Sequence, residues 1–226
     1  MNPFLQQTGA ILWKDLLTEF RSKERLSSMG FFSVLVLVTF SFALTPGSPS
    51  MIEGAGGIYW VAVIFSGFLG LTRSFSQEQI NDCMFGILLA PADRAAIYLG
   101  KMLGNLITML VLQLLLLPLF AILLNVPLLQ AMPGILLPLL LGTVGFATIG
   151  TLFSAMSVNT RLKEAMLPML TLPIFIPMLL ASVESFRAML GGATLASTMD
   201  WIRIGTVFCG VFFVACLYLF EYVVEE

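Results

Sequence analysis

The sequence contains no histidine and few charged residues. Among 226 residues there are 11 Lys and Arg and 13 Asp and Glu, so charged side chains make up 11% of the chain, against about 25% in an average soluble domain. The absence of histidine removes the commonest general base and the commonest ligand of metals and haem iron. The net charge of −2 is too small to indicate a nucleic-acid partner.

Motifs that carry enzyme chemistry are also missing. The sequence has no GxxxxGK[ST] loop for ATP phosphates, no GxSxG nucleophile motif and no paired catalytic carboxylates. The scattered cysteines Cys83, Cys209 and Cys216 form neither a disulfide framework nor a zinc motif. We therefore predict that the chain is not an enzyme, that it binds no metal and that it holds no cofactor of its own.

Long apolar runs dominate what is present. Hydrophobic residues make up 58% of the chain and the mean hydropathy is +0.98, so the main solvent of this chain is predicted to be lipid. Six runs are long enough to cross a bilayer, at about residues 29–46, 56–73, 102–124, 133–156, 165–183 and 202–224. Because lipid cannot satisfy backbone polar groups, each run is predicted to be helical. The fold class is an all-α integral membrane protein with one domain, residues 1–226.

Two features inside these runs carry further predictions. Pro168, Pro173 and Pro177 lie close together and predict a kink in the fifth span. Gly142, Gly145 and Gly150 lie in the fourth, where small residues let helices approach closely. That approach fits a dimer interface and fits packing within one chain equally well.

Basic residues in the flanking segments predict the orientation. Nine Lys and Arg fall on one side of the six runs and two, Arg187 and Arg203, fall on the other. The side richer in Lys and Arg is normally cytoplasmic. We expect both termini in the cytoplasm of a multi-pass protein.

The N-terminal segment predicts an amphipathic helix over about residues 5–27. Its apolar stripe consists of Leu12, Trp13, Leu16, Leu17 and Phe20, and the opposite face carries Lys14, Asp15, Thr18, Arg21 and Arg25. Such a helix is expected to lie on the cytoplasmic membrane surface, with Trp13 at the interface and Lys14, Arg21, Lys23 and Arg25 among its polar residues. The alternative is a helix packed on its own protein.

The segment after the second run, "LTRSFSQEQINDCMFGILLAPADRAAIYLGK", predicts a short cytoplasmic helix that turns at Ala90-Pro91 before the chain re-enters the membrane. Long structured loops usually have a function, and apolar residues mixed with charges favour a docking surface. The candidate coupling residues are Glu78, Asn81, Asp82, Phe85, Pro91, Asp93 and Arg94. A solvated loop tucked under its own bundle is the alternative.

Ionisable residues are absent from the middle of every predicted span. Ion-coupled transporters normally place such residues there. Together with the missing ATP site, this pattern favours a permease half that is driven by a separate ATPase.

The sequence also resembles a known family. The stretches "WKDLLTEFRSKERL", "YWVAVIFSGFLGLTRSF", "LLAPADRAAIYLGK", "GTLFSAMSVNTRLKEAMLPMLTLPIFIPMLLA" and "FEYVVEE" resemble haem exporter protein B (CcmB), a permease of the cytochrome c maturation system. The resemblance implies an ABC-2-like exporter permease in the bacterial inner membrane. It also implies a homodimer with an ABC ATPase that binds ATP and Mg, a haem-handling membrane subunit and a periplasmic haem chaperone.

Within this resemblance, haem is the implied cargo, and its ligands are expected on other subunits because this chain has no histidine. Either haem transfer or the release of a haem-loaded chaperone is compatible with the sequence. Two other functions stay open: a permease for another cargo, such as a lipid or drug, and a scaffold that holds haem-handling subunits without transport.

Overall fold

The structure is a computed structural model that describes residues 3–80, 93–157 and 163–223. The described part is almost entirely helical. Its elements are α1 (Pro3–Ser22), α2 (Glu24–Ala43), α3 (Pro49–Ile80), α5 (Arg94–Leu124), α6 (Leu128–Ser157), α7 (Lys163–Leu190), the 3₁₀ turn η1 (Leu195–Thr198) and α8 (Met199–Val223). The all-α prediction is confirmed.

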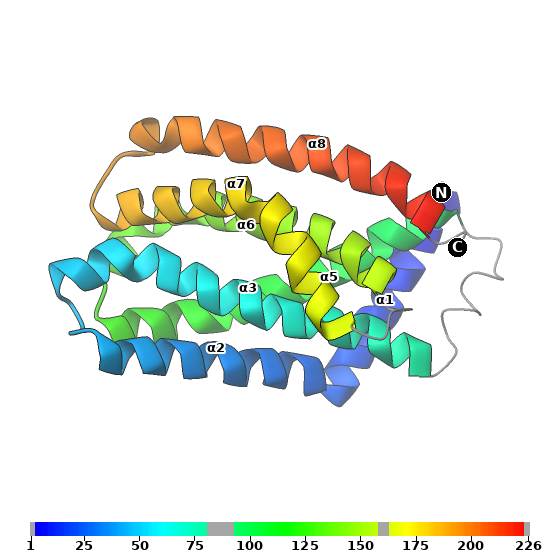
Figure 1. Cartoon of the computed structure of the whole chain (residues 1–226), viewed down its shortest axis with the longest axis horizontal. Helices are drawn as coiled ribbons and strands as arrows, with labels where there is room; N and C mark the ends of the chain where they lie inside the picture. Colours follow the sequence, from blue (N-terminus) through cyan, green and yellow to red (C-terminus); the bar gives the residue numbers. More distant parts are fainter. Residues whose placement is uncertain (1–2, 81–92, 158–162, 224–226) are drawn as a thin grey trace.

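Six of the described helices are long and apolar enough to cross a membrane: α2, α3, α5, α6, α7 and α8. Each of the six predicted runs falls on one of them. The first helix ends before the end of the first predicted run, because α2 stops at Ala43 and Leu44 adopts an extended conformation. The six helices lie side by side along one axis, and both termini are at the same end of the bundle (Figure 1).

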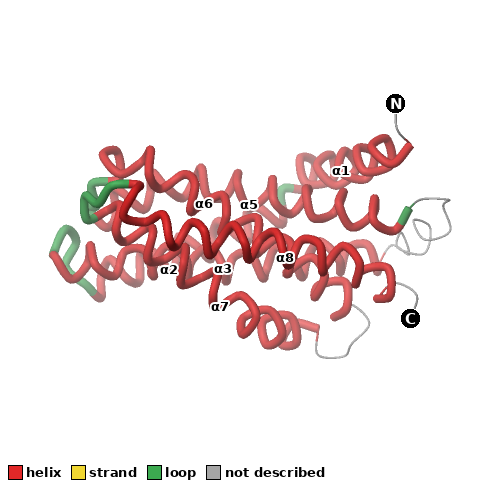
Figure 2. The backbone as a smooth tube through the Cα atoms, turned by 90° about the horizontal axis from the view of Figure 1, so that it is seen from above, coloured by secondary structure: helices red, strands yellow, loops and turns green. Residues whose placement is uncertain are grey.

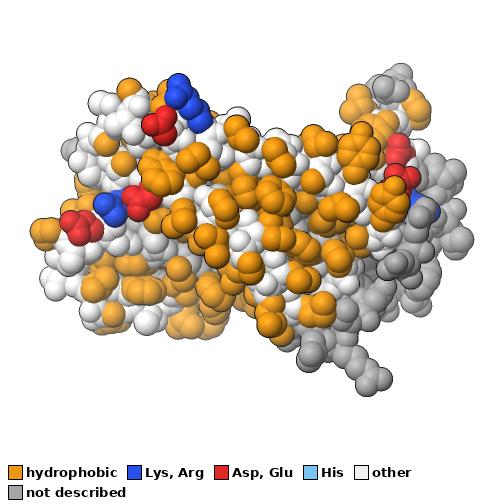
Figure 3. Space-filling view, turned by 45° about the horizontal axis from the view of Figure 1, so that its top comes forward, with side chains coloured by type: hydrophobic (Ala, Val, Ile, Leu, Met, Phe, Trp, Pro, Cys, Tyr) orange, Lys and Arg blue, Asp and Glu red, His pale blue; other side chains and the backbone are white. Residues whose placement is uncertain are grey.

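The surface is divided as a membrane protein requires. Apolar side chains cover the middle of the visible face, and charged side chains gather towards its two ends (Figure 3). At the end away from the termini, Arg187 pairs with Glu184 at 3.6 Å and Arg203 with Asp200 at 3.2 Å. An apolar belt between charged ends is the distribution expected of spanning helices.

The predicted N-terminal helix is interrupted. Lys23 adopts a left-handed backbone conformation with φ 53°, so α1 ends at Ser22 and α2 begins at Glu24. The Glu19 carboxylate accepts a hydrogen bond from the Leu26 backbone amide at 2.9 Å, which satisfies a donor in the first turn of α2. The expected single helix over residues 5–27 is therefore wrong in its extent, and Arg25 belongs to the first membrane helix.

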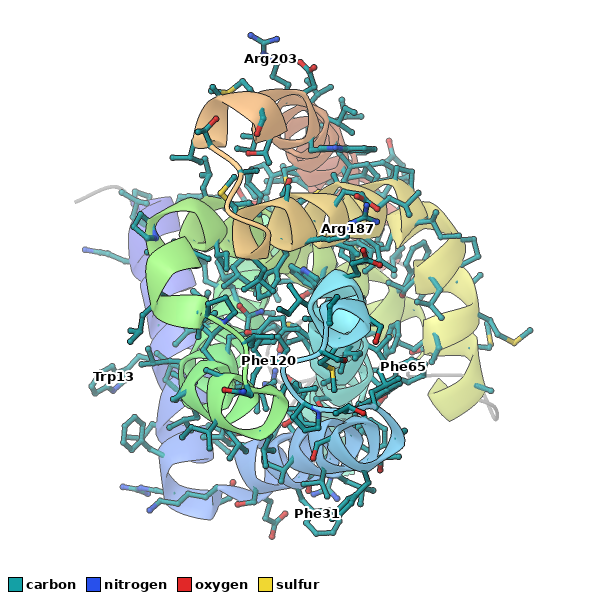
Figure 4. All side chains as sticks on the ribbon, turned by 90° about the vertical axis from the view of Figure 1, so that its left-hand side faces the viewer. Trp13, Phe31, Phe65, Phe120, Arg187 and Arg203 are labelled. Atoms are coloured by element: carbon teal, nitrogen blue, oxygen red, sulfur yellow. The ribbon has the colours of Figure 1, made fainter. Side chains whose placement is uncertain are left out.

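Aromatic and glycine packing form the core. Tyr59 of α3 stacks on Phe186 of α7 with ring centroids 5.0 Å apart and meets Phe120 of α5 edge-on at 5.2 Å; Phe120 points into the bundle in Figure 4. A Cβ atom at Gly142 would collide with Trp60 and Ser182 of neighbouring helices. The close approach that this glycine permits is thus used within the chain.

The same holds for the other two glycines of α6. A Cβ at Gly145 would contact Met178, and one at Gly150 would collide with Leu71. Cys209 and Cys216 are buried in α8 as free thiols, and Cys83 lies outside the described residues.

The proline cluster has the predicted effect. Pro168, Pro173 and Pro177 lie inside α7, and the helix bends part-way along its length (Figure 1). Proline removes a backbone donor and clashes with the preceding turn, which is the usual cause of a sharp kink.

Candidate functional site

The described candidate coupling residues lie at the end of the bundle that holds both termini. Glu78 lies in the last turn of α3, while Asn81, Asp82, Phe85 and Pro91 lie outside the described residues. The predicted short helix after the second span also falls largely outside them. Only Asp93 and Arg94 have side chains that the structure describes, and both stand at the start of α5.

Asp93 is the N-cap of α5. Its carboxylate accepts a hydrogen bond from the Ala95 backbone amide at 3.0 Å, the contact expected of an acidic N-cap. The Asp93 backbone amide donates to Gln7 Oε1 of α1 at 3.2 Å. Arg94 Nη1 donates to the Glu221 carbonyl of α8 at 3.3 Å. The start of α5 is therefore tied to both terminal helices.

The N-terminal helix α1 packs against α5 along one face. Gly100 of α5 makes room for Thr8 and Ile11, and a Cβ at this glycine would collide with them. The opposite side of α1 exposes 68% of Trp13 and 80% of Phe20, and Figure 4 shows Trp13 pointing away from the bundle. The alternative of packing on its own protein is thus seen for one face, and contact of the other face with a membrane stays a prediction.

The predicted polar face of α1 is divided between solvent and bundle. Arg21 and Lys23 are exposed, and Lys14 Nζ pairs with Asp15 at 3.0 Å. Asp15 also reaches Lys101 of α5, with Oδ2 and Nζ 3.5 Å apart. The side chain of Lys101 is only 1% exposed.

Arg25 differs most from its prediction. It was expected on the polar outer face of a surface helix, yet it is buried in α2. Its Nη2 donates to Asn105 Oδ1 of α5 at 2.7 Å, and Asn105 Nδ2 donates to Thr151 Oγ1 of α6 at 2.8 Å. One buried chain of hydrogen bonds therefore connects three membrane helices.

Two carboxylates of α1 face this network. The Arg25 guanidinium interacts electrostatically with Glu19 and Asp15. Buried charges carry a desolvation cost that only paired, hydrogen-bonded partners offset, so the position of α1 is coupled to the two buried cations, Arg25 and Lys101. We refer to Asp15, Glu19, Arg25, Lys101, Asn105 and Thr151 as the polar network.

Sequence reasoning did not find the polar network. Its members come from four separate segments, and none stands in the middle of a predicted span. One signal was available: Asn105 and Thr151 are polar residues inside apolar runs, and such residues in membrane helices usually hydrogen-bond across to a neighbour.

Comparison with known proteins places this chain in a family. A family model described as "CcmB protein" matches residues 6–219. The protein named "Heme exporter protein B" of Pseudomonas aeruginosa is 28% identical over 183 residues, which cover 81% of this chain and 82% of that protein.

Two further relatives with the same printed name match over similar lengths. The protein of Rhodobacter capsulatus is 28% identical, and the match covers 83% of this chain and 91% of that protein. The protein of Haemophilus influenzae is 29% identical, and the match covers 79% of this chain and 80% of that protein. Because the family model matches nearly the whole sequence, including the helices that form the polar network, this chain belongs to the CcmB family.

Proposed function

We propose that this chain is the membrane permease subunit of an ABC-type haem exporter that acts in cytochrome c maturation. The observation that carries the proposal is the match to proteins named "Heme exporter protein B" over about four fifths of the chain, joined to six helices able to span a membrane. In this proposal the chain lies in the bacterial inner membrane with both termini in the cytoplasm.

Energy is proposed to come from a partner. The sequence has no loop for ATP phosphates, so ATP and Mg are assigned to a separate ABC ATPase subunit, with two copies of each chain in the complex. Haem is the cargo, and a haem-handling membrane subunit and a periplasmic haem chaperone supply the ligands that this histidine-free chain does not.

Coupling is proposed to run through the segment between α3 and α5. Closure of the ATPase dimer on ATP would push on Glu78, Asn81, Asp82, Phe85 and Pro91 and on the start of α5. The hydrogen bonds of Asp93 and Arg94 would pass this movement to α1 and α8. The polar network would then carry it from α1 to α2, α5 and α6.

Deletion of the gene, complemented with wild type, tests the proposal. Haem staining should show loss of all c-type cytochromes while b-type haem remains. Accumulation of haem-loaded chaperone would favour its release as the step that this chain drives. Normal c-type cytochromes in the deletion strain would overturn the proposal and favour a permease for another cargo.

A second arm separates transport from a scaffold role. In a strain whose ATPase partner binds but cannot hydrolyse ATP, the proposal expects the same loss of c-type cytochromes. Normal assembly in that strain would mean that the complex holds haem-handling subunits together without energy-driven movement.

A further inference from the structure

A groove lies at the corner where α1, α2 and α5 meet. Its apolar lining includes Leu16 and Phe20 of α1, Leu26 of α2, and Ile107, Val111 and Leu115 of α5. The groove has a volume of about 390 Å³. Glu19 of the polar network is one of its lining residues, but neither the network nor the proposed coupling contacts account for the apolar remainder.

The groove is long and follows α5. Ile107, Val111 and Leu115 recur at every fourth residue, so they lie on one face of the helix over about 12 Å. All three belong to a helix able to span the membrane. An elongated apolar groove within such a helix suits a hydrocarbon chain, because burial of apolar surface is its main source of affinity.

Polar groups gather at one end of the groove, at the α1–α2 corner. Lys23 lines this end, it is exposed, and no ion pair joins it to another described residue. Arg21 is exposed close by in the chain, as is the acidic Glu24. The carboxylate of Glu19 also lines the groove, but its charge faces the buried Arg25 guanidinium and it accepts a hydrogen bond from the Leu26 backbone amide. Lys23 is thus the charge available to an occupant, and it favours an anionic group.

The groove opens onto the outer apolar surface of the bundle. Phe20 and Leu115, which line it, are among the large exposed hydrophobic residues, as is Trp13 on the same helix as Phe20. An occupant that enters from the side therefore comes from the membrane. Its hydrocarbon part must fill an apolar channel, and its anionic part must stop at the level of Lys23.

We propose that this groove binds one anionic phospholipid from the leaflet at the terminal end of the bundle. One acyl chain lies along α5 between Phe20 and Leu26, and the headgroup phosphate lies at Lys23. The bound lipid fills the space between α1 and the membrane helices, so it supports the position of α1. The proposal does not depend on the cargo or on the partners proposed above.

Native mass spectrometry of the full chain, purified with the subunits that remain bound and stripped of lipid in detergent, tests the site. The probes are phosphatidylglycerol and phosphatidylcholine with identical acyl chains. One phosphatidylglycerol is expected to bind roughly fivefold more tightly than phosphatidylcholine, in line with one lysine at a membrane surface. Val111→Trp fills the groove and should weaken binding of both lipids at least tenfold.

Two controls keep the test specific. Val214→Trp places the same side chain at an exposed position of α8, which does not line the groove, and should leave binding unchanged. Lys23→Gln removes the charge at an exposed position and should bring the affinities for the two lipids together without removing the acyl-chain contact.

The proposal is overturned if Val111→Trp and Val214→Trp retain phosphatidylglycerol equally, since the groove would then not be the binding site. An unchanged preference for phosphatidylglycerol in Lys23→Gln would overturn the headgroup assignment. Displacement of the bound lipid by stoichiometric haem would show that the groove is a cargo site and not a lipid site. None of these readouts uses transport, so failure of the proposed function leaves them interpretable.

Discussion

Asn105 is the residue on which the polar network depends. Its carbonyl oxygen accepts from Arg25 and its amide donates to Thr151, so one side chain serves two helices. Arg25 Nε has no hydrogen-bond partner among the described residues. The stabilisation of this buried guanidinium therefore depends more strongly on the hydrogen bond from Nη2. In a low-dielectric interior, an unpaired charged donor costs more than a neutral one.

We expect Asn105→Leu to lower the free energy of unfolding in detergent by about 1–3 kcal/mol, the cost of leaving a buried polar group without its partner. Asn105→Asp keeps an acceptor for Arg25 and should lose less. The measurement is denaturant unfolding of both variants and of Arg25→Met, arranged as a double-mutant cycle. A coupling energy near zero would mean that the two side chains do not depend on each other.

Glycine positions provide a second prediction at this scale. Gly142→Ala inserts a Cβ into the space held by Trp60 and Ser182, and overpacking of this kind typically costs about 1–3 kcal/mol. Gly210 of α8 has no atom within 4 Å of a Cβ built on it. Gly210→Ala should be neutral or stabilising, by up to about 1 kcal/mol. Thermal unfolding compares them, and equal midpoints would contradict the packing assigned to Gly142.

At the scale of elements, α1 contacts each of the parts that the proposed coupling would move together. It contacts α5 and α2. Its Gln7 side chain accepts a hydrogen bond from the Asp93 backbone amide, and its Asp15 forms an ion pair with Lys101. The first membrane helix starts directly after it, at the left-handed Lys23. A push on the start of α5 therefore has a direct route to α1 and from there to the polar network.

Reversal of the acidic charges next to α5 tests the coupling segment. Glu78→Lys combined with Asp82→Lys should abolish stimulation of the partner ATPase in the purified complex while membrane insertion is unchanged, because like charges at a docking surface oppose association. Asp200→Lys is the control, since Asp200 is exposed in the first turn of α8, which begins at the end of the bundle away from the termini (Figure 1). If all the variants stimulate the ATPase as the wild type does, the docking surface lies elsewhere.

For the whole molecule, the distribution of charge predicts the topology. The end with both termini contains Arg21, Lys23, Arg73 and Arg94, while the opposite end has Arg187 and Arg203 paired with acidic residues. The connection between α7 and α8, which contains Gly191–Gly192, lies at that opposite end (Figure 1), where green loops also lie in Figure 2. The rule that basic residues stay in the cytoplasm predicts that the terminal end faces the cytoplasm.

Reporter fusions test this orientation. Green fluorescent protein at the C-terminus should fluoresce, because it folds in the cytoplasm. Alkaline phosphatase inserted after Gly192 should be active, because it needs the oxidising periplasm. The reverse pattern, with an inactive phosphatase after Gly192 and a dark C-terminal fusion, would place both termini outside.

The sequence by itself determined the class of protein and the number and order of its membrane helices. Lipid requires about 20 apolar residues in each spanning helix and internally satisfied backbone groups. Both requirements concern runs of consecutive residues, so the sequence alone shows where they are met. The kink of α7 follows equally from local sequence, because the effect of proline acts within one turn. The family could also be recognised from stretches of consecutive residues.

Only the tertiary structure decided which polar residues meet. Arg25, Asn105 and Thr151 are separated by up to 126 positions, and helical periodicity gives the face of each residue without its partner. Arg25 was expected at the surface, but the helix break at Lys23 places it in α2, where it is buried. The choice between a dimer interface and internal packing for Gly142 also depended on where Trp60 and Ser182 lie. Such contacts depend on how whole helices pack, which no local pattern specifies.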